Sequence, residues 1–278
     1  MGKLALEKIV LQYSKRGMDI LEQHMEPGYC RRAAEKLLQT QRGNVLLTTG
    51  FFVAGYAETD GPLGTVAVAL ALNSLGFHSI IVTDKYCKGF FELKGIDVEY
   101  VDIDSDREAY DKILARYDPV YLISIERCGK NTDNEYANMR GISITEETAQ
   151  VDLMFELAME RKIPTIGVGD GGNEIGMGNL KDIIRGELEL NPCVVPVDDL
   201  IIATTSNWGA YAIAAYLQKL SGEKVLVGFD EIEKYLADIL EIGCVDGVRK
   251  EKVMGVDGFD MTVEKEILDC LAENSQGV

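Results

Sequence analysis

The feature that most constrains this chain is an alternation of short apolar runs with longer amphipathic segments, which begins near residue 43. Six short runs read as strands, at residues 45–48, 79–83, 97–102, 120–125, 165–168 and 200–203. Strands that alternate with helical segments favour a parallel sheet, because parallel neighbours need a long crossover connection between them. The sequence therefore predicts an α/β, Rossmann-like fold, a mostly parallel sheet with helices on both faces.

The ends of the predicted helices carry local signals. Pro62 suits the first turn of an almost wholly apolar helix that Gly76 ends. Ser143 and Glu146 match the spacing of a capping box, which predicts a helix start there. Further helices are predicted from Ser206 or Asn207 to Gly222, from Asp230 to Gly243 and from about Thr262 to Leu271, with a turn-rich loop or hairpin between Arg249 and Gly255.

The first 42 residues lack this alternation. Leu6, Ile9 and Val10 recur at helical spacing, and the pair Pro27-Gly28 interrupts the pattern before it resumes. The chain has 278 residues, and a single core still accommodates a chain of about this length. We therefore predict an N-terminal helical extension at residues 1–42 and one α/β domain at residues 43–278.

The charge balance narrows the partners. The chain has 28 Lys and Arg against 46 Asp and Glu, a formal net charge of −18. Such a charge repels nucleic acids and anionic membrane surfaces, and no basic cluster offsets it. The longest nearly apolar stretch, residues 63–72, is shorter than the roughly 18 residues that span a bilayer. We expect a cytoplasmic protein that acts on a small molecule and binds neither nucleic acid nor membrane; assembly into a homo-oligomer is left open.

Acid–base chemistry in this chain falls mainly to carboxylates. The six cysteines are spread singly, without a C-x-x-C pair, and there are two histidines. A zinc site of Cys/His type normally needs closely spaced ligand pairs, and a Ser-His-Asp triad needs a suitably placed histidine. Both kinds of site are disfavoured, as is a disulfide framework in a chain of this size.

In open parallel sheets, ligands bind at the carboxyl ends of the strands, where loops and helix N-termini converge. The first notable loop at such an end, TTGFFVAGYAETDGPLG after the first strand, is long for a βα connection. Its candidate residues are Thr49, Gly50, Glu58, Thr59 and Asp60. The alternative is that Asp60 caps the following helix and that the glycines only make turns.

The second loop, GVGDGGNEIGMGN at residues 167–179, is rich in glycine. It formally matches G-x-G-x-x-G, but the first glycine lies within the predicted strand, which disfavours dinucleotide binding. Its candidate residues are Asp170, Gly171, Gly172, Asn173 and Glu174. Free backbone N–H groups suit an anion, and a divalent cation such as Mg²⁺ on Asp170 and Glu174 is left open. The alternative is a mobile surface turn; in either case we expect solvent-accessible side chains.

The third loop, ERCGKNTDNEYANMRG at residues 126–141, brings positive charge into an acidic chain. Arg127 and Arg140 are suited to bidentate carboxylate recognition, with Asn138 beside the second of them. The alternative is that each arginine pairs with a structural carboxylate. Ser206 and Asn207, at the start of a later helix, lie at the same predicted edge of the sheet.

Five motifs in these loops carry a family resemblance. They are TTGF at 48–51, ETDGPLG at 58–64, NMRG at 138–141, GDGGNEIGMG at 169–178 and SNWG at 206–209. In this order they resemble the D-glutamate cyclase-like family, over roughly residues 43–258. The resemblance implies an α/β fold and the conversion of D-glutamate to 5-oxo-D-proline with loss of water.

That reaction needs a general base for the amine, help for the departing water and donors for an oxyanion. We take Asp60, Asp170 and Glu174 as the catalytic candidates, without assigning base and acid among them. The substrate-binding candidates are Thr49, Gly50, Glu58, Thr59, Arg127, Asn138, Arg140, Gly171, Gly172, Asn173, Ser206 and Asn207. We favour Arg140 as the anchor for a substrate carboxylate, with Arg127 as the alternative.

Two other functions remain open at this point. The chain could act on a related amino-acid or lactam substrate, or it could be a non-catalytic phosphate- or nucleotide-binding module that uses the glycine-rich loop. All readings share one structural expectation: the loops at residues 48–64, 126–141, 169–178 and 204–209 line one pocket.

Overall fold

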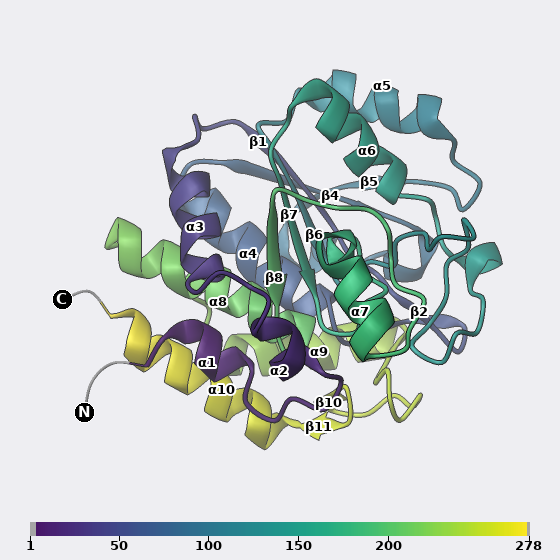
Figure 1. Ribbon diagram of the computed structural model, residues 1–278. Coiled ribbons are helices and arrows are strands. Elements are labelled where there is room, and N and C mark those ends of the chain that lie inside the picture. Colours follow the sequence, from purple (N-terminus) through teal and green to yellow (C-terminus); the bar gives the residue numbers. More distant parts are fainter. Residues whose placement is uncertain (1–3, 277–278) are drawn as a thin grey trace.

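The computed structural model describes residues 4–276, which form a sheet surrounded by helices (Figure 1). The central sheet has six parallel strands: β1 (Asn44–Thr48), β4 (His78–Thr83), β5 (Asp97–Tyr100), β6 (Tyr121–Ile125), β7 (Thr165–Gly169) and β8 (Asp199–Ile202). Their spatial order is β5-β4-β1-β6-β7-β8, so the chain moves outward from β1 in both directions. The predicted α/β fold and the six predicted strands are confirmed.

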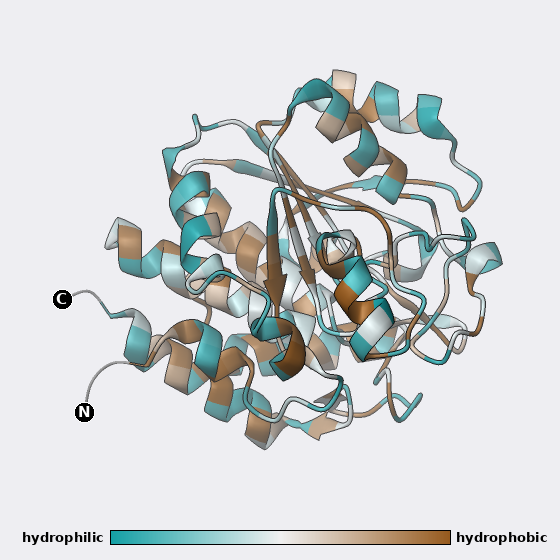
Figure 2. Ribbon diagram, viewed as in Figure 1, coloured by the Kyte–Doolittle hydropathy of each residue, from teal (hydrophilic) through white to brown (hydrophobic). Residues whose placement is uncertain are grey.

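The strands are continuous apolar runs because helices cover both faces of the sheet. Every residue of β6 is buried, and in β1 only Asn44 is partly exposed. In Figure 2 the central strands are brown, the colour of apolar residues.

Helices α3 (Tyr29–Gln39), α4 (Pro62–Ser74) and α8 (Ser206–Ser221) lie on one face of the sheet, and α5 (Arg107–Tyr117) and α6 (Asp152–Arg161) on the other (Figure 1). Helix α4 is buried along most of its length, because it packs against both the sheet and α8. The chain continues through α7 (Lys181–Glu187), α9 (Phe229–Ile242) and α10 (Met261–Ser275). The helix starting at Ser206 is as predicted, and Thr205 is its N-cap.

The N-terminal segment forms α1 (Leu6–Val10), α2 (Met18–Glu22) and α3. It shares one hydrophobic core with the sheet, since Leu6, Ile9 and Val10 are fully buried in the same cluster as the central strands. It is also tied to the end of β8, where the Thr204 N–H donates to the Val10 carbonyl at 2.8 Å. The segment between α1 and α2 thereby runs past the carboxyl end of the sheet.

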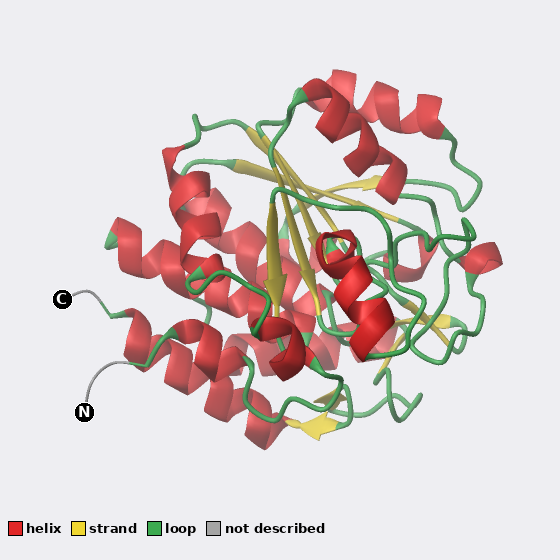
Figure 3. Ribbon diagram, viewed as in Figure 1, coloured by secondary structure: helices red, strands yellow, loops and turns green. Residues whose placement is uncertain are grey.

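Small sheets complete the structure beside this end. One consists of β2 (Phe52–Val53), β3 (Tyr56–Glu58) and β9 (Cys244–Val245), and a hairpin joins β10 (Gly255–Val256) to β11 (Phe259–Asp260). Short 3₁₀ turns occupy Lys85–Cys87, Phe91–Lys94, Thr145–Glu147 and Met177–Leu180. Figure 3 shows the loops that follow the central strands gathered at the arrowhead end of the sheet. Within residues 4–276, no helix is both long and apolar enough to cross a membrane.

One helix prediction is wrong. Ser143 and Glu146 do not begin an α-helix; Ser143 precedes the 3₁₀ turn Thr145–Glu147, Glu146 lies within it, and α6 begins only at Asp152. The Ser143 hydroxyl is used locally, with the Thr145 hydroxyl at 3.0 Å. The true start of α6 is fixed by tertiary contacts, because the buried Asp152 carboxylate accepts a hydrogen bond from the Tyr136 hydroxyl.

Candidate functional site

The site lies where the sheet order reverses, between β1 and β6, so that their loops diverge and leave a crevice. A cavity of about 460 Å³ opens there. Its polar lining residues are Arg16, Glu58, Glu126, Asn138, Arg140, Ser143, Glu147, Asp170, Asn173, Lys250 and Asp257. Apolar side chains of the β1–β2 region, including Phe51 and Phe52, form another wall. A small molecule of amino-acid size fits this volume.

Beneath the cavity, two helices cap each other. The Asp60 carboxylate, just before α4, accepts the N–H groups of Ser206 and Asn207 at 2.8 and 2.7 Å at the start of α8. In return the Asn207 side-chain oxygen accepts the N–H groups of Gly61 and Gly64 at the start of α4. The motifs ETDGPLG and SNWG are therefore two halves of one joint.

Two glycines are required at this joint, because there is no room for a side chain at either position. A Cβ on Gly61, whose φ is +97°, would lie 2.3 Å from the Thr49 hydroxyl, and one on Gly64 would lie 2.6 Å from the Ala210 Cβ. The close approach of α4 and α8 thus depends on Gly64, and Gly61 lets the start of α4 lie against Thr49 and Glu126. The consequence is that Asp60 is held at the meeting point of two helix N-termini, where a negative charge is favoured.

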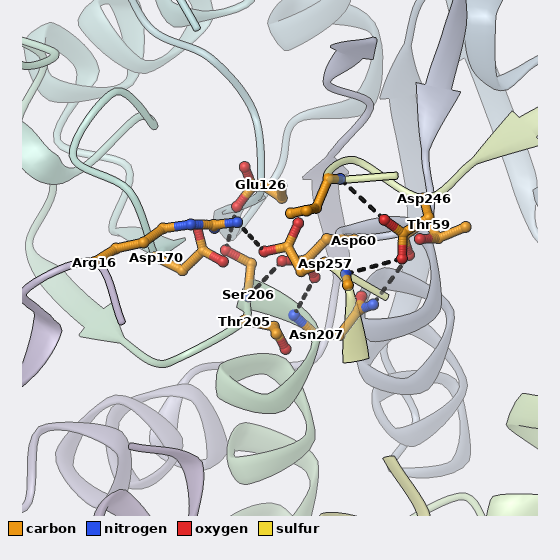
Figure 4. A network of polar contacts seen from close by, with 12 residues as sticks. Arg16, Thr59, Asp60, Glu126, Asp170, Thr205, Ser206, Asn207, Asp246 and Asp257 are labelled. Atoms are coloured by element: carbon orange, nitrogen blue, oxygen red, sulfur yellow. Dashed lines mark hydrogen bonds and ion pairs between the residues drawn. The ribbon is translucent and has the colours of Figure 1, made fainter. Parts of the chain in front are cut away.

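Six buried acidic side chains gather around this joint: Glu58, Asp60, Glu126, Asp170, Glu174 and Asp257. Figure 4 shows Asp60, Glu126, Asp170 and Asp257. One carboxylate oxygen from each of Asp60, Glu126 and Asp170 lies within 4.8 Å of the other two. A Cβ on Gly247 would lie 1.9 Å from Glu58 Oε2 and 3.1 Å from Asp257 Oδ1, which places these two carboxylates next to each other. The sequence predicted that Asp60 and Asp170 share one edge, and the structure confirms it.

Arg16 provides the positive charge in this cluster. Its guanidinium reaches in from the segment between α1 and α2 and contacts Asp170 Oδ1 at 2.7 Å and Asp257 Oδ2 at 2.6 Å (Figure 4). Burial lowers the pKa of Arg16, but the neighbouring Asp170 and Asp257 outweigh this and hold it above its ordinary value. Arg16 therefore remains charged and ties the N-terminal segment to the site.

Asp257 reaches the cluster because another buried acid shapes its loop. The Asp246 carboxylate accepts the N–H groups of Val248, Arg249 and Gly258 at 3.0, 2.7 and 2.9 Å. These bonds close the loop between β9 and β11 and direct the Asp257 side chain toward Arg16. Asp246 thus positions a residue of the site and does not line the cavity itself.

Glu126 enters the site from the end of β6. Its φ of 48° lies in the left-handed region, which is strained for a residue with a Cβ and often marks a functional position. The Ser206 hydroxyl donates to Glu126 Oε2 at 2.5 Å. This bond fixes the carboxylate over the start of α8.

Burial and mutual repulsion raise the pKa values of these acids. Burial, and then the charge of Asp257, raises the pKa of Asp60 to about 7 in spite of its backbone N–H donors. Burial, followed by the charge of Asp170, raises the pKa of Asp257 to about 8. For Glu58, Glu126, Asp170 and Glu174 burial is again the main cause of a raised pKa. The cluster can therefore hold and exchange protons near neutral pH.

The predicted site residues fall into four groups. Glu58, Asn138, Arg140, Asp170 and Asn173 line the cavity, and Asp60, Glu174, Ser206 and Asn207 lie buried beneath it. Gly171 and Gly172 line a neighbouring cavity of about 410 Å³. Thr49, Gly50, Thr59 and Arg127 are buried among structural contacts; the Thr59 hydroxyl, for example, donates to the Gly255 carbonyl.

Arg127 is engaged as a structural residue. Its side chain is fully buried, with Nη2 2.7 Å from Asp84 Oδ2 and Nη1 2.7 Å from the Gly50 carbonyl. Arg140 differs, because its side chain is exposed at the cavity and no ion pair is recorded for it among residues 4–276. The Asn138 side-chain oxygen accepts the Arg140 and Ile142 N–H groups, so Asn138 shapes the turn that presents Arg140.

The expectation that the glycine-rich loop is solvent-accessible is wrong. Asp170 and Glu174 are each 1% exposed, because the loop packs against residues 127–129. The Ile175 N–H donates to the Arg127 carbonyl and the Gly129 N–H to the Asn173 carbonyl, both at 2.9 Å. The Gly172 N–H donates to Glu174 Oε2 at 2.8 Å, so the chain's own carboxylate uses a backbone donor that a phosphate would need.

The site residues that sequence reasoning did not select are Arg16, Glu126, Asp246 and Asp257. Glu126 directly follows a strand, which was a usable signal. Asp246 and Asp257 each precede a glycine in a turn-rich segment, which is a weaker signal than the position of Glu126. Nothing near Arg16 marks it as a site residue, since it lies 154 positions from its partner Asp170.

The family described as "D-glutamate cyclase-like, C-terminal" matches residues 6–272. The chain belongs to this family. The match includes the N-terminal helices, which lie before the region of the sequence resemblance, and the Asp246–Asp257 loop near its end.

Within the family, the human protein named "D-glutamate cyclase, mitochondrial" is 34% identical over 204 residues, which are 63% of this chain. The matched part is 32% of the human protein, so the chain spans about a third of the length of the relative that it matches. That relative is named mitochondrial, and a cytoplasmic location for this chain stays a prediction.

Two solved structures show a distant likeness. UDP-GlcNAc 2-epimerase from Methanocaldococcus jannaschii is 14% identical with a TM-score of 0.36, over 72% of this chain and 51% of its own. UDP-glucose 4-epimerase from Brucella ovis is 12% identical with a TM-score of 0.32, over 66% and 49%.

Proposed function

We propose that this chain is a lyase of the D-glutamate cyclase type, which converts D-glutamate to 5-oxo-D-proline with loss of water. The observation that carries the proposal is a cavity of about 460 Å³ that is lined both by buried carboxylates and by Arg140. Glutamate carries an ammonium and two carboxylates, so it needs both kinds of partner. Family membership supports the same reaction.

The proposed reaction is internally balanced. The amine nitrogen forms a bond to the γ-carboxyl carbon, and one carbon–oxygen bond of that carboxyl breaks. The ammonium loses two protons, and both end on the departing oxygen, which leaves as water. A proton-sharing pair of carboxylates can carry out this transfer without net change.

Glu58 and Asp257 are the pair that we assign to proton transfer. Both line the cavity, and the space beside Gly247 places their oxygens next to each other. Their raised pKa values, caused first by burial, allow one to be protonated while the other is not. Arg140, exposed at the same cavity, would hold the α-carboxylate of the substrate.

The phosphate- or nucleotide-binding alternative has less support. Glu58, Glu126, Glu147, Asp170 and Asp257 all line the cavity and would repel a phosphate. An enzyme on a related amino-acid or lactam substrate is compatible with the same groups, and substrate testing separates it from a D-glutamate cyclase.

The test is incubation of the chain with D-glutamate, L-glutamate and 5-oxo-D-proline, with amine loss or gain measured over time. We expect D-glutamate to lose its amine and L-glutamate to be unchanged. Glu58→Gln and Asp257→Asn should abolish turnover, whereas Asp238→Asn, on the exposed side of α9, should not. Turnover by Glu58→Gln and Asp257→Asn equal to that of the wild type would contradict the assignment.

A further inference from the structure

The oxygen atoms of Asp60, Glu126 and Asp170 converge on one point from three different elements. Asp60 precedes α4, Glu126 follows β6 and Asp170 follows β7, and one oxygen from each lies within 4.8 Å of the others. Across Mg²⁺ or Ca²⁺, opposite oxygen ligands lie about 4 to 5 Å apart, twice the metal–oxygen distance. The spacing therefore suits a hard divalent cation.

A second observation points to a missing positive partner. Asp170 is 1% exposed, and its Oδ2 atom receives no hydrogen bond from any residue between 4 and 276. Its other oxygen already contacts Arg16. A buried acceptor without a donor is costly, and a bound cation would satisfy the free oxygen. The Asp170 side chain points toward Glu126 and Ser206 in Figure 4.

The remaining atoms of the three carboxylates are already held in place. Ser206 donates its hydroxyl to Glu126 and its N–H to Asp60, and Asn207 donates its N–H to Asp60. Hydrogen bonds of this kind orient the ligands of metal sites and leave the other lone pairs free. The site is preorganised before any cation arrives.

The charge balance favours the same occupant. Within the cluster, Arg16 is ion-paired with Asp170 and Asp257, while Asp60 and Glu126 have no ion pair within residues 4–276. A divalent cation neutralises two charges at the point where the three oxygens meet. Oxygen ligands without sulfur or imidazole select Mg²⁺, Mn²⁺ or Ca²⁺ over zinc or copper.

We propose that Asp60, Glu126 and Asp170 form a binding site for a divalent cation of the Mg²⁺ class. This ligand set differs from the pair Asp170 and Glu174 that the sequence left open, because the oxygens that converge belong to Asp60, Glu126 and Asp170, whereas Glu174 Oε2 accepts the Gly172 N–H. The proposal does not depend on the cyclase reaction, since a cation can bind here in any enzyme or binding protein.

The experiment uses Mn²⁺ as a probe for the whole chain, first treated with a chelator and then dialysed. Electron paramagnetic resonance of free Mn²⁺ measures binding without substrate. We expect one tight site per chain, weakened by about 100-fold or more in Asp170→Asn and Glu126→Gln, because loss of a residue that only supports a metal ligand already costs about 10- to 100-fold. The matched controls Asp238→Asn and Glu233→Gln change exposed acids of α9 and should bind like the wild type.

A measurement on the wild type locates the site even if a variant fails to fold. Bound Mn²⁺ broadens nearby amide signals in a ¹H–¹⁵N spectrum, and we expect this at Gly61, Ser206 and Asn207 but not along α9. Mg²⁺ should reverse it by competition. Absence of Mn²⁺ binding, unchanged binding in both folded site variants, or broadening centred on α9 would overturn the proposal. A failed cyclase assay would leave these outcomes unaffected.

Discussion

Two groups of buried charges lie at the same edge of the sheet, and they differ in how they are paired. Arg127, after β6, contacts Asp84 and the carbonyls of Gly50 and Ala149, so that only its Nε atom lacks a recorded acceptor. The acidic cluster instead places six buried carboxylates around Arg16 and leaves Asp170 Oδ2 without a donor. A balanced ion pair holds loops together, whereas a cluster with unpaired carboxylates can bind a positively charged group and exchange protons.

The largest expected change in the free energy of unfolding comes from breaking the balanced pair. Arg127→Met leaves Asp84 as a buried, unpaired charge, which should lower this free energy by about 3–5 kcal/mol. Urea denaturation followed by circular dichroism gives the value. A loss below about 1 kcal/mol would mean that Arg127 is not the structural residue described here. Removing both charges, in Arg127→Met with Asp84→Leu, should recover part of the loss.

The unbalanced cluster should make stability depend on pH in the absence of divalent cations. Its carboxyls have raised pKa values in the folded state, about 7 for Asp60 and about 8 for Asp257, so folding favours their protonated forms. That stabilisation is complete below their ordinary pKa of about 4 and is lost as pH rises through 7 to 8.

We expect the free energy of unfolding to fall by at least about 1 kcal/mol between pH 5 and pH 8, because a pKa shift of one unit corresponds to about that much free energy. Chemical denaturation at a series of pH values measures it, with Asp238→Asn as the control. Asp170→Asn removes one of the repelling charges and should flatten the profile. A profile that is flat in the wild type would show that the carboxyls are not forced to share protons.

Asp170→Asn should change stability little and function greatly. The substitution removes a buried charge whose Oδ2 atom has no donor, and Arg16 keeps Asp257 as a partner. We therefore expect an unfolding free energy within about 1 kcal/mol of the wild type, or above it, together with loss of turnover. Glu174→Gln should also lose turnover, but it disturbs the bond to the Gly172 N–H. Full activity of Asp170→Asn would remove this carboxylate from the mechanism.

The smallest effect on stability is expected at Arg140, because its side chain is exposed. Arg140→Ala should alter the unfolding free energy by no more than about 0.5 kcal/mol. Its kcat/KM for D-glutamate should fall by an amount equivalent to about 2–4 kcal/mol, and Arg140→Lys should recover only part. If the wild type, Arg140→Ala and Arg140→Lys have the same kcat/KM, Arg140 is not the anchor for the substrate carboxylate. Arg16 would then take the role, since it lines the cavity and Arg127 does not.

The sequence by itself determined the layered fold and the edge at which the site lies. Six apolar runs separated by helical segments admit a parallel sheet, and the strand ends then bring Asp60 and Asp170 to one edge. Helix ends marked by Pro62 and Gly243 were also predictable, because these signals act through the backbone of the same segment. The same loops carry the motifs by which the family was recognised.

Only the tertiary structure decided what each charged side chain does. Asp60 reads as a cap for its own helix, but its carboxylate accepts the N–H groups at the start of α8, 146 positions further along the chain. Arg127 and Arg140 look alike in sequence, but one is fully buried against Asp84 and the other faces the cavity. Arg16 and Asp257 come from opposite ends of the chain and meet at 2.6 Å. Such pairings depend on how the helices and loops pack around the sheet, and no local pattern of residues records that packing.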